Sequence, residues 1–343
     1  MRGWRLLIGA AMIMVAMIIG MGKVLAQQVP LEPRFSEPEG WRWGEFRNAD
    51  GARIRYGWII PADPIATVVL VTGFGEFGEK YFESVRDLTA RRLAVWQMDW
   101  RGQGGSERYL ANRQKPFAAG YHHDVADLHQ FSTTVVRRPP GGTIVLLAHS
   151  MGGHIGLRYL HDFPTTFDFA VMSAPMIAIK ERGGIPLWLG RAMAMIARRL
   201  GFAEAYVPGS GDWAFKADFK VEDSNVSQDP VRYRVAQDYQ ARKPDLQLGG
   251  ATFGWLDNAF RSITLLNEES YLRAIRTPLL MGTPQNEQVV QTAAQDRACS
   301  LMGRCEQVRI EGAKHEIWME RDEYRRQWLA AIDRFVAARL QRR

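Results

Sequence analysis

A serine stands where a buried strand gives way to a helix, a position from which its hydroxyl could act as a nucleophile. Residues 148–153 read Ala-His-Ser-Met-Gly-Gly, with Ser150 as the serine. The apolar residues 143–148 predict the strand, and residues 151–163 predict the helix. A sharp turn between such elements is typical of a nucleophile elbow, G-x-S-x-G, in which Ala148 here replaces the first glycine. A serine that only caps the helix is the alternative.

A serine hydroxyl is a weak nucleophile until a base removes its proton. In folds that carry such an elbow, the base follows the last strand of the sheet. His315 lies directly after the predicted strand at residues 307–310, so we expect it to be the general base. His149 is expected to pack or form a hydrogen bond beside Ser150. The remaining histidines lie on or beside predicted helices and are expected to be ordinary surface or buried residues: His122, His123, His129, His154 and His161.

The base in turn needs a carboxylate that holds its tautomer and stabilises its charge. The loop at residues 282–290, after the predicted strand at residues 278–281, contains one carboxylate, Glu287. We therefore expect Glu287 to be the acid, with Asp296, further along the predicted helix at residues 288–300, as the fallback. A glutamate that faces solvent at a helix N-terminus is the alternative role for Glu287.

Two backbone amides are candidates for stabilising the negatively charged oxygen of a reaction intermediate. Met151 is the first residue of the predicted helix after the serine, so its N–H has no partner within that helix. The N–H of Phe74 lies in Thr-Gly-Phe-Gly-Glu, after the predicted strand at residues 67–71, where glycines let the backbone approach a substrate. A plain glycine-rich turn is the alternative at Phe74. A second glycine-rich loop, residues 99–106, is expected to support the elbow without a chemical role.

The elements around these residues predict an α/β fold. Continuous apolar strands that alternate with helices indicate a mostly parallel sheet with helices on both faces. An antiparallel hairpin is predicted at residues 45–58, with its turn at residues 48–51. The alternation stops at residues 176–255, which predict a helical cap insertion over the C-terminal edge of the sheet. The remaining predicted strands are residues 94–98 and 169–173, and the remaining predicted helices are residues 82–92, 122–137, 256–272 and 323–340.

The N-terminus predicts export. Arg2 and Arg5 precede an uncharged stretch of about 17 residues, which ends near small residues suited to cleavage. Residues 1–26 are therefore expected to be a signal peptide, with an uncleaved membrane anchor as the alternative. Residues 27–40 contain three prolines and predict a linker to a domain at residues 41–343. Either alternative predicts a periplasmic enzyme or one anchored to the outer face of the cytoplasmic membrane.

Composition narrows the expected partners. The 343 residues carry a formal net charge of +7, and their basic residues are scattered. The sequence lacks basic clusters interleaved with stacking aromatics, so a lipid surface is favoured over nucleic acid as the partner. A solvated basic surface that has no partner is the alternative. Neither a metal-ligand cluster nor a cofactor motif is found, so none is expected. Cys299 and Cys305 are expected to form a disulfide in an exported protein, with two buried thiols as the alternative.

Several of these motifs together resemble the α/β-hydrolase family of monoacylglycerol lipases and bacterial lysophospholipases. The similarity extends from about residue 40 to residue 340, and the matching segments are residues 73–76, 79–83, 99–106, 149–153, 244–246, 254–256 and 312–316 with Glu320 and Asp322. It implies the α/β-hydrolase fold and cleavage of one acyl ester on a glycerol-based lipid, with Ser150 and His315 as nucleophile and base. Thr72 departs from the histidine common in the family at that position, and Glu287 departs from its usual aspartate.

Two other functions stay open from sequence. One is a general carboxylesterase for soluble acyl esters, and the other is a catalytically silent, membrane-tethered binding protein. Dehalogenases and epoxide hydrolases share the fold but need an aspartate in place of Ser150. The apolar and basic stretch at residues 185–200 could contact a lipid surface, although packing on its own domain is the more common role of such a helix.

Overall fold

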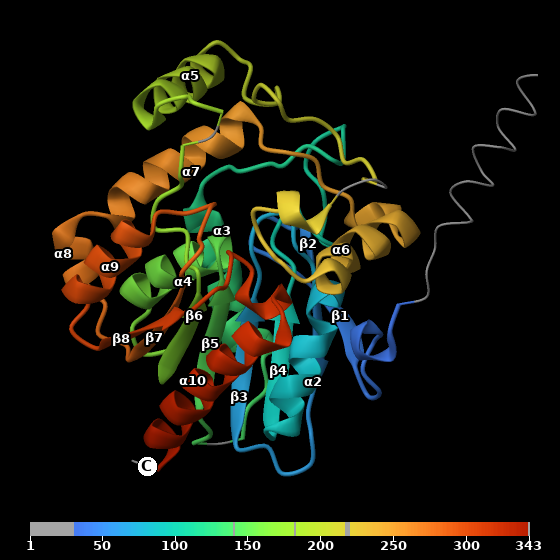
Figure 1. Cartoon of the computed structure of the whole chain (residues 1–343), viewed down its shortest axis with the longest axis vertical. Coiled ribbons are helices and arrows are strands. Elements are labelled where there is room, and N and C mark those ends of the chain that lie inside the picture. The colour runs from blue at the N-terminus through green and yellow to red at the C-terminus, as the bar shows by residue number, and fades with distance from the viewer. Residues whose placement is uncertain (1–30, 140, 182, 217–219, 342–343) are drawn as a thin grey trace, which may run out of the picture. The chain divides into compact units, whose positions relative to one another are not determined.

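An eight-stranded sheet with the order β1-β2-β4-β3-β5-β6-β7-β8 runs through the protein (Figure 1). The computed structural model describes residues 31–139, 141–181, 183–216 and 220–341, and Arg34–Arg343 form one compact unit. The predicted signal peptide or anchor, residues 1–26, lies outside the described residues. The strands are β1 (Arg42–Arg47), β2 (Arg53–Ile59), β3 (Ala66–Val71), β4 (Leu93–Met98), β5 (Ile144–His149), β6 (Phe169–Ser173), β7 (Leu279–Pro284) and β8 (Cys305–Ile310).

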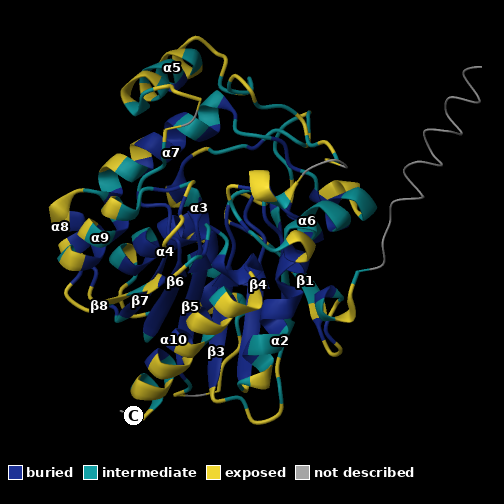
Figure 2. Cartoon of the chain, viewed as in Figure 1, coloured by how far each residue is buried: buried dark blue, intermediate teal, exposed yellow. Residues whose placement is uncertain are grey.

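The sheet is mixed but mostly parallel. β1 pairs antiparallel with β2, and β2 pairs antiparallel with β4, whereas the pairs from β4 through β3 to β8 are parallel. Every residue of β3 to β7 is buried. Because successive side chains of a strand point to opposite faces, both faces of this central region must be covered. Figure 2 shows these strands in dark blue beneath the surrounding helices. The predicted fold class is confirmed.

Helices provide that cover. α2 and α10 lie over the strands in Figure 1, and α3 packs against α4. Gly156 lets α4 approach β5 closely, because a Cβ at that position would lie 3.1 Å from the Cδ2 atom of Leu146. The helices are α2 (Phe82–Ala90), α3 (Tyr121–Gln130), α4 (Met151–Asp162), α5 (Leu187–Arg199), α6 (Pro230–Arg242), α7 (Phe253–Leu266), α8 (Glu269–Ala274), α9 (Thr292–Leu301) and α10 (Asp322–Leu340).

The chain between β6 and β7 carries α5, α6, α7 and α8. In Figure 1 the first three of these helices lie beyond the end of the sheet at which β5 leads into α4. α5 packs mainly against α7. Among the described residues, none of the helices combines the length and the apolar character needed to cross a bilayer.

Two predicted helices differ from the structure. The helix predicted at residues 256–272 is two helices, α7 and α8, because the chain turns at Asn267, whose side-chain amide donates to the carbonyls of Ile177 and Ile263. The helix predicted from residue 288 begins only at Thr292. The preceding residues are not helical, and Ile179 and Val290 form an isolated antiparallel bridge there.

Two local predictions hold. The hairpin of β1 and β2 closes through Asn48, whose Oδ1 accepts hydrogen bonds from the N–H groups of Asp50 and Ala52. Cys299 and Cys305 form a disulfide that links α9 to the first residue of β8. These two cysteines therefore have no free thiol that could bind a metal ion.

Candidate active site

Ser150 sits in a strained turn between β5 and α4. Its backbone has φ 51° and ψ −115°, a conformation that is costly for a residue with a side chain. The turn brings the chain close to β3, since a Cβ on Gly152 would lie 2.5 Å from the Thr72 carbonyl oxygen. A Cβ on Gly153 would lie 2.7 Å from the Cβ of Pro175. Both glycines are therefore required sterically, and the strain is of the kind stored at functional sites.

Three side chains from distant parts of the chain meet at this turn. The Nε2 atom of His315 lies 2.8 Å from Oγ of Ser150, and its Nδ1 atom lies 2.8 Å from Oε2 of Glu287. Ser150 follows β5, Glu287 follows β7 and His315 follows β8. All three are buried. Hydrogen bonds on both ring nitrogens set the tautomer: Nδ1 donates to the carboxylate, and Nε2 accepts from the serine hydroxyl.

Glu287 is held in its ionised form. Burial alone would raise the pKa of this carboxyl, but attraction to His315 and its hydrogen bonds lower that pKa overall. The second oxygen, Oε1, accepts hydrogen bonds from the N–H groups of Val289 and Val290, at 2.7 and 3.1 Å. The same non-helical residues, which precede the start of α9, thus fix the carboxylate.

Asp296, the fallback acid, lies elsewhere. Its carboxylate is on the exposed side of α9 and binds Arg309 and the side-chain amide of Gln307. The structure brings Glu287 to His315 and leaves Asp296 in a surface ion pair.

The two candidate oxyanion amides flank the serine. Met151 directly follows Ser150 as the first residue of α4. Phe74 follows Gly73, at which an added Cβ would lie 3.2 Å from the Cβ of Ser150. In the part of the chain that the structure describes, neither amide N–H donates to a protein acceptor. Both are therefore available to a ligand oxygen.

The loop at residues 99–106, which was expected to support the elbow around Ser150, holds the Phe74 loop. The indole N–H of Trp100 donates to the Thr72 carbonyl at 2.7 Å. The side-chain carbonyl of Gln103 accepts from the N–H of Gly75 at 2.6 Å. These contacts hold the backbone on both sides of Phe74.

A buried charge cluster, whose residues were not among the predicted site residues, also contacts this loop. Glu76 accepts hydrogen bonds from the N–H of Gly73 and from the hydroxyl of Tyr81. Lys80 lies between two carboxylates, with Nζ 2.6 Å from Oε1 of Glu76 and 2.8 Å from Oε1 of Glu316. One sequence feature could have indicated this cluster. Glu76 and Lys80 are four residues apart, close to the glycines of the Phe74 loop and in a segment with apolar neighbours.

The neighbours of Glu76 hold its carboxylate in the ionised form. Burial would raise its pKa, but the positive charge of Lys80 and the hydrogen bond from Gly73 lower it to about 2. His149 lies within the same buried region, and burial lowers its pKa to about 4, so its ring is neutral near pH 7. The His149 Nδ1–H donates to the Ser173 carbonyl, as expected for a packing role.

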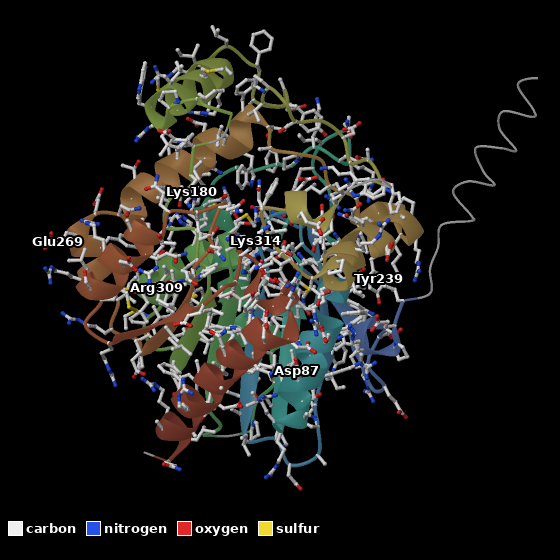
Figure 3. All side chains as sticks on the ribbon, in the orientation of Figure 1. Asp87, Lys180, Tyr239, Glu269, Arg309 and Lys314 are labelled. Carbon is white, nitrogen blue, oxygen red and sulfur yellow. A yellow bond between two sulfur atoms is a disulfide. The ribbon has the colours of Figure 1, made fainter. Side chains whose placement is uncertain are left out.

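Two lysines fix the loops that carry the acid and the base. Lys180 Nζ donates to the backbone carbonyl of Glu287, and Lys314 Nζ donates to the carbonyl of Ser224. Both lysines are labelled in Figure 3. No group of three or more His, Cys, Asp or Glu side chains suited to a metal ion occurs within the described ranges.

Solved structures share this fold. A carboxyl esterase from Bacillus coagulans in complex with glycerol superposes with a TM-score of 0.70 at 17% identity, over 88% of this chain and 100% of that chain. A soluble variant of monoglyceride lipase from Saccharomyces cerevisiae gives a TM-score of 0.68 at 16% identity, over 90% and 99% of the two chains.

Sequence comparison places the chain more narrowly. It is 30% identical over 300 residues to lysophospholipase L2 of Escherichia coli K12. The aligned region spans 84% of this chain and 85% of that relative. A shorter match, 31% identical over 132 residues, is to human monoglyceride lipase, over 38% of this chain and 42% of the relative. The family described as serine aminopeptidase S33 matches residues 62–322. The chain therefore belongs to this α/β-hydrolase family, as a serine hydrolase of the lysophospholipase and monoglyceride lipase group.

Proposed function

We propose that this protein hydrolyses the acyl ester of a monoacyl glycerolipid through an acyl-serine intermediate. The observation that carries the proposal is the continuous hydrogen-bonded chain from Ser150 through His315 to Glu287, with 2.8 Å at both steps. The relatives named lysophospholipase and monoglyceride lipase support the substrate class. Hydrolysis of this kind needs no cofactor.

The proposed reaction has two halves. Ser150 transfers its proton to Nε2 of His315 as its oxygen attacks the ester carbonyl, while Glu287 stabilises the imidazolium. The N–H groups of Met151 and Phe74 stabilise the oxyanion. The bond to the alcohol then breaks, and His315 returns the proton to that leaving oxygen. In the second half His315 takes a proton from water as the water oxygen attacks the acyl-serine carbonyl. The bond between the acyl carbon and the Ser150 oxygen then breaks, His315 returns the proton to that oxygen, and the fatty acid is released.

We also propose that the insertion at residues 176–255 caps the site. Its last residue, Trp255, packs on the oxyanion loop, with ring centroids of Trp255 and Phe74 4.2 Å apart. Leu248 of the same segment lies near Gly75, 4.0 Å from the position of an added Cβ. A cap that touches the oxyanion loop is suited to covering an acyl chain during the reaction.

A lipid surface is the proposed location of the substrate. Large apolar side chains are exposed on α5 and its flanks, and Trp188 is 71% exposed. Figure 2 shows α5 in yellow and teal, unlike the dark blue strands. Three arginines, Arg191, Arg198 and Arg199, lie on the same helix and suit anionic headgroups. The exposed apolar residues of this segment are Ile185, Trp188, Leu189, Ile196, Leu200 and Phe202.

We propose that the protein acts outside the cytosol, either in the periplasm or on the outer face of the cytoplasmic membrane. The disulfide between Cys299 and Cys305 supports this location, because disulfides persist in oxidising compartments. The basic and apolar N-terminal sequence supports it independently.

The test is turnover by the purified protein on lysophospholipids, monoacylglycerols and nitrophenyl esters of graded acyl length. Ser150→Ala is expected to abolish hydrolysis and labelling by a fluorophosphonate. Ser300→Ala, at an exposed serine of α9, should retain both. Turnover that persists in Ser150→Ala would refute the mechanism.

The remaining outcomes distinguish the alternatives. A preference for short, soluble esters over lipids would identify a general carboxylesterase. Folded wild-type protein that neither reacts with the fluorophosphonate nor turns over any ester would identify a silent binding protein.

A further inference from the structure

A cavity of about 150 Å³ lies between α3, α4 and α7, and Ser150 is not among the residues that line it. Its walls include Tyr121 at the start of α3, Arg158 of α4, and Asn258 and Arg261 of α7. Arg158 comes eight residues after Ser150 on a helix that rises ~1.5 Å per residue, so the two Cα atoms are separated by about 12 Å. The proposed ester chemistry uses none of these residues.

The first turn of α3 presents open backbone donors to this cavity. α3 begins after Gly120, and no side chain caps its N-terminus. The N–H groups of Tyr121 and His122, both cavity-lining residues, have no partner within the helix. The positive end of the helix dipole points the same way and favours a negative ligand.

A buried amide supplies an independent observation. Asn258 is only 4% exposed, and its Oδ1 accepts a hydrogen bond from Arg261 at 3.2 Å. Within the described ranges its Nδ2 has no hydrogen-bond partner. A buried amide group left without an acceptor is uncommon and calls for a ligand that accepts hydrogen bonds.

The hydroxyl of Ser262 does not fill this need. The Nδ1–H of His154 donates to the Met176 carbonyl, so Nε2 accepts the proton of Ser262 at 2.6 Å. Burial lowers the pKa of His154 to about 3, which keeps that ring neutral. Ser262 in turn accepts from Nη1 of Arg158 at 3.0 Å. Donors therefore outnumber acceptors around the cavity.

The charged groups around the cavity also favour a negatively charged ligand. Across the described residues, Arg158 has no carboxylate within ion-pair distance, and its buried Nε has no partner. Burial lowers the pKa of His122, and repulsion from His123, Arg158, Arg101 and Arg261 lowers it further. Two acids lie nearby. Asp257 is shared by Arg198 and Arg261, at 2.8 and 3.0 Å. Burial raises the pKa of Asp124 to about 8, so it is largely neutral at pH 7.

We propose that this cavity binds an oxyanion of the size of phosphate, through the N-terminus of α3, the guanidinium groups of Arg158 and Arg261, and the amide of Asn258. A cavity of this volume holds a molecule as large as benzene, so phosphate fits. The ligand is either free phosphate or the phosphate of a lipid headgroup, since both present the same oxygens.

Equilibrium dialysis of the full chain against radiolabelled phosphate tests the site. The wild type is expected to bind phosphate saturably at millimolar concentration or below. Asn258→Asp keeps the side-chain shape but places a carboxylate in the cavity, and Arg158→Met removes a charge. Each should weaken binding at least about tenfold, since a hydrogen bond to a charged group is worth that much. Arg273→Met, at an exposed arginine of α8 that pairs with Glu269, is the matched control and should bind normally.

Folding and catalysis are separated from binding in the same experiment. Hydrolysis of a short nitrophenyl ester and the thermal unfolding midpoint show whether each variant is folded. The Ser150→Ala protein should bind phosphate as the wild type does, so a failure of the proposed function leaves this test intact. Absence of saturable binding by the wild type, or equal affinity in folded Asn258→Asp and Arg158→Met, would overturn the proposal.

Competition identifies the source of the phosphate. Displacement by both glycerol 3-phosphate and phosphatidylglycerol vesicles would assign the cavity to a lipid headgroup. Displacement by glycerol 3-phosphate, with no effect of the vesicles, would assign it to a soluble phosphate compound.

Discussion

Nζ of Lys80 lies 2.8 Å from Oε1 of Glu316, the residue that follows His315 in the chain. The same ammonium group contacts Glu76, whose carboxylate holds the N–H of Gly73. One lysine thus joins the loop after β3, which carries a candidate oxyanion amide, to the loop after β8, which carries the candidate base. The two halves of the proposed site are connected through buried charge.

Removal of this lysine should affect both stability and turnover. Lys80→Met leaves the buried Glu76 and the partly buried Glu316 without their partner, which is expected to cost about 3–5 kcal/mol in the free energy of unfolding. In protein that remains folded, kcat should fall more than KM changes, because the oxyanion loop is misplaced. Lys80→Arg should restore much of both. Chemical unfolding and steady-state kinetics measure the two effects.

A surface lysine is the matched control for that prediction. Lys243 pairs with Glu79 at 3.0 Å, but its side chain is half exposed. Lys243→Met should cost less than about 1 kcal/mol. A loss in Lys80→Met no larger than that of the control would show that the buried cluster does not position the site.

The acid assignment can be tested by replacing the two candidate carboxylates. Glu287→Gln keeps the side-chain length but removes the charge that orients and stabilises His315, so kcat should fall by roughly three to four orders of magnitude. Asp296→Asn should leave kcat almost unchanged, because Asp296 pairs with Arg309 on the surface. Hydrolysis of one ester by both variants decides between them. A large loss in Asp296→Asn alone would contradict the proposed role of Glu287.

Asp124 predicts a pH dependence of stability. Its pKa is raised to about 8 because burial disfavours the carboxylate; attraction to Arg101 opposes this shift and repulsion from Asp127 adds to it. The folded protein therefore binds this proton more tightly than the unfolded chain, whose pKa is about 4. Its contribution to stability is fully present below about pH 4 and is lost as pH rises to 8, by at most about 1.4 kcal/mol per pH unit.

A neutral variant isolates that contribution. Asp124→Asn cannot ionise, so its unfolding midpoint should rise relative to the wild type between pH 5 and pH 8. Asp245→Asn, at a carboxylate whose side chain is 86% exposed, should track the wild type at every pH. Parallel curves for wild type and Asp124→Asn would show that this carboxyl titrates normally.

The exposed face of α5 predicts a selective effect on lipid binding. Trp188→Gln removes the most exposed large apolar side chain of that segment and should weaken binding to anionic vesicles about tenfold or more. Hydrolysis of a short soluble ester should be unchanged. Ile60→Gln, at a 50% exposed residue just after β2, is the control that should not alter vesicle binding. Sedimentation with vesicles measures both. Equal binding by wild type and Trp188→Gln would argue against α5 as the membrane contact.

Much of the fold could be predicted from the sequence, because local runs of apolar residues indicate which strands are buried. The apolar run ending at residue 148, followed by small residues around Ser150, indicates a buried strand and a tight turn with no knowledge of the rest of the chain. The parallel central strands are buried on both faces, so each is composed mainly of apolar residues. Such runs depend only on neighbouring residues, which is why their predicted positions agree with β3 to β7 within a few residues.

The sequence was less informative where a segment takes its structure from a distant one. Residues 288–291 are helical by local pattern, yet Val290 pairs with Ile179 and the helix starts later. Asn267 ends α7 through a hydrogen bond to Ile177, which lies 90 residues away. Hydrogen bonds of this kind override local propensity, and the signal for them is absent from either segment alone.

The sequence by itself determined the succession of the core strands and helices along the chain, and it indicated Ser150, His315 and Glu287 as site residues. Both depend on residue type and periodicity, which act over a few neighbouring positions. Only the tertiary structure decided that Glu287 rather than Asp296 reaches His315, that Lys80 bridges Glu76 and Glu316, and that Asn258 of α7 lines a cavity with residues of α3 and α4. These relationships join loops far apart in the chain, and their distances depend on how the whole sheet and its helices pack.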